Sequence, residues 1–192
     1  MTHLQVIVGS TRGDRFAAKV SEWVDDRLGA RDDTSHEVVD LRDYPLPFFD
    51  QPPPAHTIRD YPNEATAMLG RRLDAADAFI FLTPEYNHAY PAVLKNAIDH
   101  TFVEWNRKPA AFIGWGNTGG ARAIEQLRLV TVELEMAPLR HAVHIMPDAM
   151  MAMREDGADP TRVLAPFDPR LDVLVTDLVW WSRALESARS AS

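Results

Sequence analysis

The chain has 192 residues, and 28 acidic against 20 basic side chains give it a formal net charge of −8. Hydrophobic residues make up 46% of it, which is enough for a folded core and excludes intrinsic disorder. The lack of cysteine excludes disulfides, thiolate metal sites and a cysteine nucleophile. No apolar run is long enough to span a bilayer, and the first residues do not resemble a signal peptide. We expect one cytoplasmic domain over residues 1–192 that binds neither nucleic acid nor membrane.

The spacing of apolar residues alternates between strand-like and helix-like periods along the chain. The first half predicts, in order, a strand over 4–8, a helix over 17–28, a strand over 37–41, a proline-rich surface loop over 45–54, a helix over 63–75 and a strand over 78–83. The second half predicts a helix from Pro91 through Phe102, a strand over 110–113, a helix over 124–134, a strand over 139–145 and a last helix over 171–185.

This alternation indicates an α/β fold in which helices cover both faces of a parallel sheet. Five strands suit the flavodoxin-like order 2-1-3-4-5, a three-layer sandwich. Such sheets bind ligands beyond the carboxyl ends of their strands, where strands 1 and 3 meet. The loops that follow Val8, Leu82 and Ile113 are therefore the places to look for a site.

The first of these loops runs from Gly9 to the helix start at Phe16. Hydroxyls come from Ser10 and Thr11, and positive charge comes from Arg12 and Arg15. Together with the free amides and positive dipole of a helix start, they predict a phosphate site. The alternative is an ordinary capped turn with its arginines in water.

The second loop lies between Thr83 and Pro91, and prolines restrict it at both ends. Tyr86 and Tyr90 offer flat surfaces, and backbone amides without internal partners would suit a planar heterocycle with carbonyls and ring nitrogens. The alternative is that both tyrosines simply cover the edge of the sheet.

The third loop, from Gly114 to Gly120, has four glycines in seven positions, which would let its backbone approach a ligand closely. It matches the G-x-G-x-x-G dinucleotide fingerprint. We reject that interpretation because the fingerprint normally follows the first strand. The acidic residues at the required spacing, Glu133 and Glu135, are also expected inside a helix.

Taken together, the three loops resemble the NADPH-dependent FMN reductase family of flavodoxin-like proteins. The matching motifs are Gly9-Ser10-Thr11-Arg12 with Arg15, the run from Thr83-Pro84-Glu85-Tyr86-Asn87-His88 to Pro91-Ala92-Val93-Leu94-Lys95-Asn96-Ala97-Ile98-Asp99, and the segment from Gly114-Trp115-Gly116 to Arg128. The likeness covers roughly residues 3–147, and its second motif is the most specific.

The resemblance implies FMN as cofactor and assigns roles to the matching positions. Ser10, Arg12, Arg15 and Phe16 would surround the FMN phosphate, in the loop that also holds Thr11. Pro84, Glu85, Tyr86 and Asn87 would line the isoalloxazine ring and ribityl chain, largely through backbone groups. Trp115, Gly116, Asn117 and Thr118 would pack near the opposite edge of the ring.

It also implies an activity. Hydride would pass from NADPH (or NADH) to FMN and then to a flavin, quinone or similar small acceptor on the same ring face, in ping-pong turnover. No side chain is assigned as catalyst; His88 is the nearest candidate proton donor and a solvated loop histidine otherwise. Relatives are commonly homodimers or homotetramers. The alternatives are a flavodoxin-like electron carrier without nicotinamide activity and a cofactor-free interaction protein.

Several other residues have structural interpretations. Asp99 and His100 are expected to be structural or interfacial, and Trp105 and the pair Trp180-Trp181 to be core or interface aromatics. The methionines between 146 and 153 predict an exposed apolar patch that contacts a second subunit; a mobile loop on its own chain is the alternative. The acidic residues show no metal-ligand spacing.

Overall fold

The computed structural model of the protein describes residues 1–13, 15–50 and 59–191. Its sheet consists of five parallel strands: β1 (Thr2–Val8), β2 (Thr34–Asp40), β3 (Ala78–Pro84), β4 (Pro109–Trp115) and β5 (Ala137–Ile145). The order across the sheet is β2-β1-β3-β4-β5, which confirms the predicted flavodoxin-like order. The prolines at 52, 53 and 54 of the predicted surface loop lie outside the described residues.

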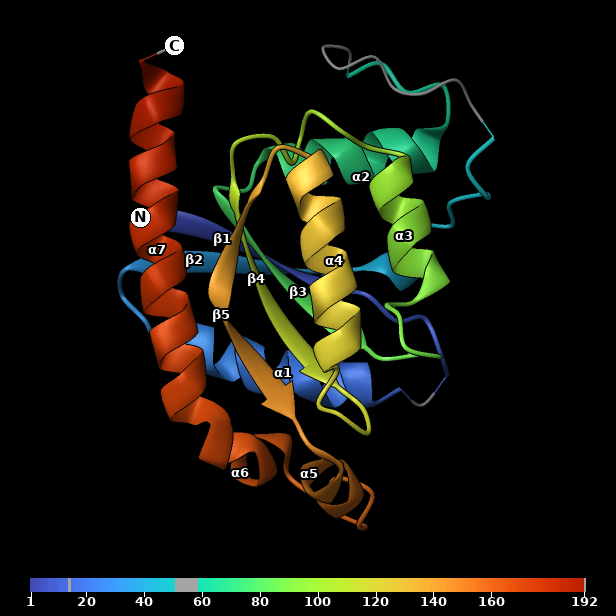
Figure 1. Cartoon of the computed structure of the whole chain (residues 1–192), viewed down its shortest axis with the longest axis vertical. Coiled ribbons are helices and arrows are strands. Elements are labelled where there is room, and N and C mark those ends of the chain that lie inside the picture. Colours follow the sequence, from blue (N-terminus) through green and yellow to red (C-terminus); the bar gives the residue numbers. More distant parts are fainter. Residues whose placement is uncertain (14, 51–58, 192) are drawn as a thin grey trace.

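Helices cover both faces of this sheet, as the alternating pattern predicts (Figure 1). One face is covered by α1 (Phe16–Gly29) and α7 (Asp168–Ser190), and the other by α2 (Glu64–Asp74), α3 (Ala92–Asp99) and α4 (Ala121–Glu133). Each layer of helices closes its own apolar core against the central strands, whose residues are almost completely buried. The sheet is therefore rigid in its middle, and variation is left to its edges and loops.

The structure also contains short elements that the sequence pattern does not predict. After β5 the chain forms α5 (Pro147–Ala152) and α6 (Pro160–Leu164), and single 3₁₀ turns lie at Leu41–Asp43 and Ala165–Phe167. Segments of three to six residues are too short to show a helical period, so composition alone gave no signal for them.

Two predicted boundaries were also wrong. The second strand begins at Thr34 because it pairs with β1 from Thr2 onward, and Leu41 lies in the turn that follows. The third helix stops at Asp99, before Phe102, which packs on the core from the loop beyond.

The expected structural residues do have structural contacts. Asp99 accepts from Lys95 at 2.6 Å, one turn earlier on α3. Buried His100 lies between the Thr66 hydroxyl at 3.1 Å and the Pro47 carbonyl at 3.0 Å. Trp105 belongs to the core of the α2–α4 face, as predicted.

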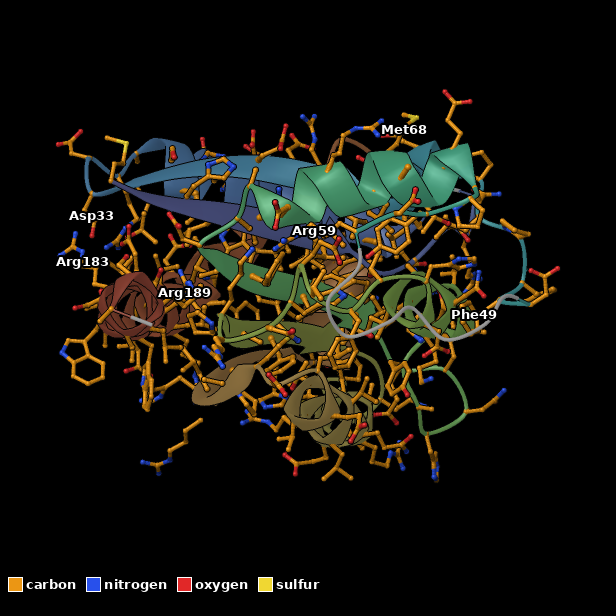
Figure 2. The ribbon with its side chains drawn as sticks, turned by 90° about the horizontal axis from the view of Figure 1, so that it is seen from above. Asp33, Phe49, Arg59, Met68, Arg183 and Arg189 are labelled. Atoms are coloured by element: carbon orange, nitrogen blue, oxygen red, sulfur yellow. The ribbon has the colours of Figure 1, made fainter. Side chains whose placement is uncertain are left out.

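The last helix, α7, also passes the amino-terminal edge of the sheet. There Arg183 lies beside Asp33, the residue before β2 (Figure 2). A hydrogen bond from Arg31 and, more weakly, the charge of Arg183 lower the pKa of Asp33. On the far side of the molecule, Met68 projects outward from α2 (Figure 2). No helix in the described part of the chain combines the length and apolarity needed to cross a bilayer.

A buried lysine, Lys108, hydrogen-bonds to the carboxyl end of α2. The Nζ of Lys108 donates to the carbonyl oxygens of Leu73 at 3.3 Å and Asp74 at 3.0 Å, and the Leu73 carbonyl also accepts from the Ala76 amide at 3.2 Å. A cation at this position is also stabilised by the negative end of the helix dipole. Burial nevertheless lowers the pKa of Lys108 to about 8.

This lowered pKa predicts a pH-dependent contribution to stability. Between about pH 8 and 10.5 the unfolded chain binds the proton that folded Lys108 has lost, so the free energy of unfolding rises with pH, by at most about 1.4 kcal/mol per pH unit. Lys108→Met should remove this rise in urea unfolding measured at several pH values. The control is Lys95→Met, which removes a half-exposed lysine and should keep the wild-type slope. An unchanged slope in Lys108→Met would contradict the assignment.

Candidate functional site

A cavity of about 750 Å³ opens at the carboxyl edge of the sheet, where the three predicted loops meet. Eleven of the thirteen predicted cofactor-binding residues line it: Ser10, Arg12, Arg15, Phe16, Pro84, Glu85, Tyr86, Asn87, Trp115, Gly116 and Asn117. The other two, Thr11 and Thr118, do not. Seven further residues that were not predicted to bind cofactor complete the wall: Ala17, Lys19, His88, Arg122, Met150, Met153 and Arg154.

The first loop leaves the sheet at Gly9, where only glycine fits. Its amide extends the β1–β3 ladder to the Leu82 carbonyl at 2.9 Å, and a Cβ there would lie 2.8 Å from that oxygen. No described acceptor takes up the amides of Thr11, Arg12 or Gly13. The helix start behind them has neither a side-chain cap nor an acidic residue in its first turn. This end of α1 is thus electrostatically suited to an anion.

Arg15, at the start of α1, is the most informative residue of the cavity. Its side chain is only 7% exposed, and its Nη2 donates to a carboxylate oxygen of Asp40, the last residue of β2. Its Nε and Nη1 are buried and have no hydrogen-bond partner among the described residues. Buried charged donors are normally satisfied. An anion in the cavity would supply the missing acceptor.

The second loop is a tight hairpin turn that reaches back to the first. Tyr86 and Ala89 exchange backbone hydrogen bonds of 2.8 and 3.0 Å, and Asn87 and His88 between them have φ values of 50° and 71°. This is the left-handed geometry of a two-residue hairpin loop. The amides of Tyr86 and Ala89 are therefore satisfied internally, unlike the free amides that the sequence suggested.

Tyr86 connects this turn to the first loop. Its hydroxyl is 3.0 Å from the Oγ of Ser10, which is buried, and the guanidinium carbon of Arg12 lies 5.6 Å from the centre of its ring. The two loops thus share one wall of the cavity through contacts between their side chains.

The Glu85 side chain links the second loop to the third loop and to the start of α4 through hydrogen bonds. Its carboxylate accepts from the Thr118 hydroxyl at 3.0 Å and from the Arg122 backbone amide at 3.2 Å and Nε at 2.6 Å. Burial alone would raise the pKa of Glu85, but these hydrogen bonds and the charge of Arg122 outweigh it and lower the pKa. Because Arg122 lies in the first turn of α4, the carboxylate also caps that helix from another loop. These contacts indicate a structural role for the Glu85 side chain.

The glycines of the third loop serve mainly to pack the loop itself, which corrects the expectation that they let its backbone approach a ligand. A Cβ on Gly120 would lie 2.6 Å from the Trp115 amide, and one on Gly114 would lie 2.8 Å from Ile124. Gly119 is equally close to His144. Only Gly116, with φ 145°, lines the cavity.

Of the two acidic residues expected inside a helix, one lies there. Glu133 is the last residue of α4, as expected, whereas Glu135 lies in the turn beyond it, with φ 56°. Both precede β5 and so lie away from the carboxyl edge of the sheet. The rejection of a dinucleotide fingerprint therefore stands.

The segment that follows β5 forms a wall that the sequence did not predict. Met150 and Met153 line the cavity, and the Met153 carbonyl accepts from the Nζ of Lys19 on α1 at 2.5 Å. Only Met146 and Met151 of the four methionines are largely exposed. The expectation of one exposed methionine patch was thus half wrong. One feature of the sequence pattern could have predicted this wall: the fifth strand ends at the same sheet edge as the others, so the segment after it begins beside the cavity.

The cavity carries excess positive charge in a protein with a net charge of −8. Among the described residues, five cations line it, namely Arg12, Arg15, Lys19, Arg122 and Arg154, against one carboxylate, that of Glu85. Such a local field attracts anions. Within the described ranges, no group of three or more His, Asp or Glu side chains could hold a metal ion.

His88 is an acceptor in this arrangement. Its Nε2 lies 2.9 Å from the Nη1 of Arg122, and because a guanidinium can only donate, Nε2 is the acceptor in this contact. The imidazole is exposed at the rim. The structure therefore agrees better with a solvated loop histidine than with a proton donor at Nε2.

The ion pair between the buried Glu85 carboxylate and the partly exposed Arg122 predicts a stability effect at the site. Glu85→Gln should lower the free energy of unfolding at pH 7 by about 2 kcal/mol, because Arg122 loses its buried charge partner. Since the folded pKa is lowered, this difference is present above about pH 4.5 and is lost as the pH falls below it. Glu125→Gln removes an exposed partner of Arg128 on the same helix and should cost less than about 0.5 kcal/mol. Equal effects of both variants in urea unfolding would contradict the role of Glu85.

The chain matches the family model described as NADPH-dependent FMN reductase over residues 2–149. It is 37% identical over 149 residues to an NAD(P)H-dependent FMN reductase of Schizosaccharomyces pombe, covering 76% of this chain and 74% of the relative. A quinone reductase of Pseudomonas putida is 30% identical, with 75% and 74% covered. The structure of the flavoenzyme FerB, an NAD(P)H:(acceptor) oxidoreductase of Paracoccus denitrificans, superposes with a TM-score of 0.73 at 26% identity, over 96% of this chain and 98% of that one. The chain therefore belongs to the NADPH-dependent FMN reductase family.

Proposed function

We propose that this reductase holds FMN in the cavity and passes electrons from NAD(P)H to a small-molecule acceptor such as a flavin or quinone. Family membership supports the reaction class. The observation that supports the site is the pair of buried, unpartnered nitrogens on Arg15, which call for an anion at the start of α1. When bound, FMN supplies the hydride and electron chemistry.

The phosphate end would be held by the first loop. Arg15 offers its unpartnered Nε and Nη1, Ser10 its hydroxyl, and Arg12 an exposed positive charge. The amides of Thr11, Arg12 and Gly13 add free donors. This set combines fixed charge with oriented N–H groups, the combination that phosphate monoesters require.

The ring would lie across the second and third loops. Pro84 and Tyr86 present flat surfaces there, and Trp115 is braced edge-on by Phe16 with ring centres 5.7 Å apart. The amides of Asn117 and Thr118 donate to no described oxygen, so they are available to ring carbonyls. The chain's part in the reaction is then to orient the ring and to stabilise negative charge on it.

We also propose a cytoplasmic homo-oligomer, in line with the cysteine-free sequence and the exposed apolar side chains of α4 and α7. Leu129 and Val132 are 74% and 59% exposed, and Trp180 and Trp181 are 63% and 38% exposed. A single sedimenting species of monomer mass at micromolar concentration would contradict the oligomer.

A single substitution tests the phosphate end. Arg12→Ala should weaken FMN binding by about tenfold and change riboflavin binding little, because riboflavin lacks the phosphate. Titration by flavin fluorescence measures both affinities. Arg42→Ala, which removes an exposed arginine outside the cavity wall, is the control. Equal weakening of both flavins would refute the assignment.

Anaerobic addition of NADPH or NADH tests the activity. The FMN-loaded protein should lose its absorbance near 450 nm within seconds and regain it when a quinone or free flavin is added. Persistent colour with both nucleotides would indicate an electron carrier instead of a reductase. Failure of the pure protein to bind added FMN would support a cofactor-free interaction protein.

A further inference from the structure

Asp40 contacts Arg15 of the cavity wall, but it lies outside the three predicted loops and outside the motifs that identify the family. It is the last residue of β2, and it lies beside the start of the first loop because the parallel register pairs Asp40 with Val8 of β1. Buried Ser10 comes two residues after the Val8 that pairs with Asp40, and the Asp40 carboxylate contacts Arg15 at the start of α1.

Two contacts fix this carboxylate. One oxygen accepts from the backbone amide of Arg42 at 3.0 Å, which holds the turn after β2, and the other accepts from the Nη2 of Arg15. The guanidinium is thus tied on one side to a rigid strand end. Its Nε and Nη1 remain without acceptors, although the side chain is 93% buried and lines the cavity.

We propose that Asp40 is a positioning residue that aims Arg15 at the phosphate of FMN. The inference rests on the proposed function and adds to it the residue that sets the geometry of the phosphate site. An arginine side chain has several rotatable bonds, and ordering it costs conformational entropy on binding. A fixed carboxylate partner makes that ordering part of the folded state, so that the guanidinium is already held in the cavity wall before the anion binds.

The physical alternative is that the charge of Asp40 weakens FMN binding instead of supporting it. A carboxylate near a phosphate repels it, and removing that charge would then tighten FMN binding. The sign of the change therefore separates positioning from repulsion. Asp40→Asn is the sharpest variant because asparagine keeps an oxygen for the Arg42 amide while it removes the charge that holds Arg15.

The test measures dissociation constants for FMN and riboflavin with wild type, Asp40→Asn, Arg15→Ala and the double variant. Asp40→Asn should weaken FMN by roughly tenfold and leave riboflavin within about twofold. In the Arg15→Ala background, the same substitution should have no further effect on FMN. A merely structural role would weaken both flavins together.

The control is Glu37→Gln, which breaks an ion pair from the same strand to Arg72 at 2.6 Å, with a similarly exposed carboxylate. It should leave both flavin affinities unchanged. Unchanged or tighter FMN binding in Asp40→Asn, or an equal loss with and without Arg15, would overturn the proposal. If wild type itself binds no FMN, the proposed function fails instead, so the two failures are distinguishable.

Discussion

The site depends on one constraint, that all five strands are parallel and end at one edge of the sheet. The register places Val8 beside both Asp40 and Leu82, and Trp115 beside both Pro84 and Ile145. Segments more than a hundred residues apart in the sequence therefore converge on a single cavity. The cavity exists because the sheet pairs in this order, and the loops only determine its chemistry.

At this edge of the sheet, two ion pairs, each with one buried partner, differ in how many of their polar atoms remain unpartnered. Removing charges from water is costly unless each finds a partner. Glu85 has both of its oxygens occupied by Thr118 and Arg122, so it holds loops together. Arg15 has only one nitrogen occupied, by Asp40, and its Nε and Nη1 have no hydrogen-bond partner among the described residues. The first pair is complete within the described residues, and the second leaves two donors unsatisfied.

The sequence predicted the strand order and the three loops because buried strands are apolar runs and loop residues such as Arg12 and Tyr86 stand out from them. It did not predict the partners, because the contacts of Arg15 with Asp40 and of Glu85 with Arg122 depend on which strands are neighbours. It also misjudged Gly120, whose lack of a side chain relieves contact with Trp115 inside the loop. The wall at Met150 was missed because α5 is only six residues long.

That wall also affects how well the cavity can adapt in shape. The Met150 side chain is half-buried in it, and a thioether side chain is unbranched, polarizable and able to change rotamer at little cost. The Met153 side chain is fully buried, and the hydrogen bond from Lys19 to the Met153 carbonyl holds the backbone beside it. The cavity therefore has one adjustable side chain, Met150, in a wall whose backbone is held in place.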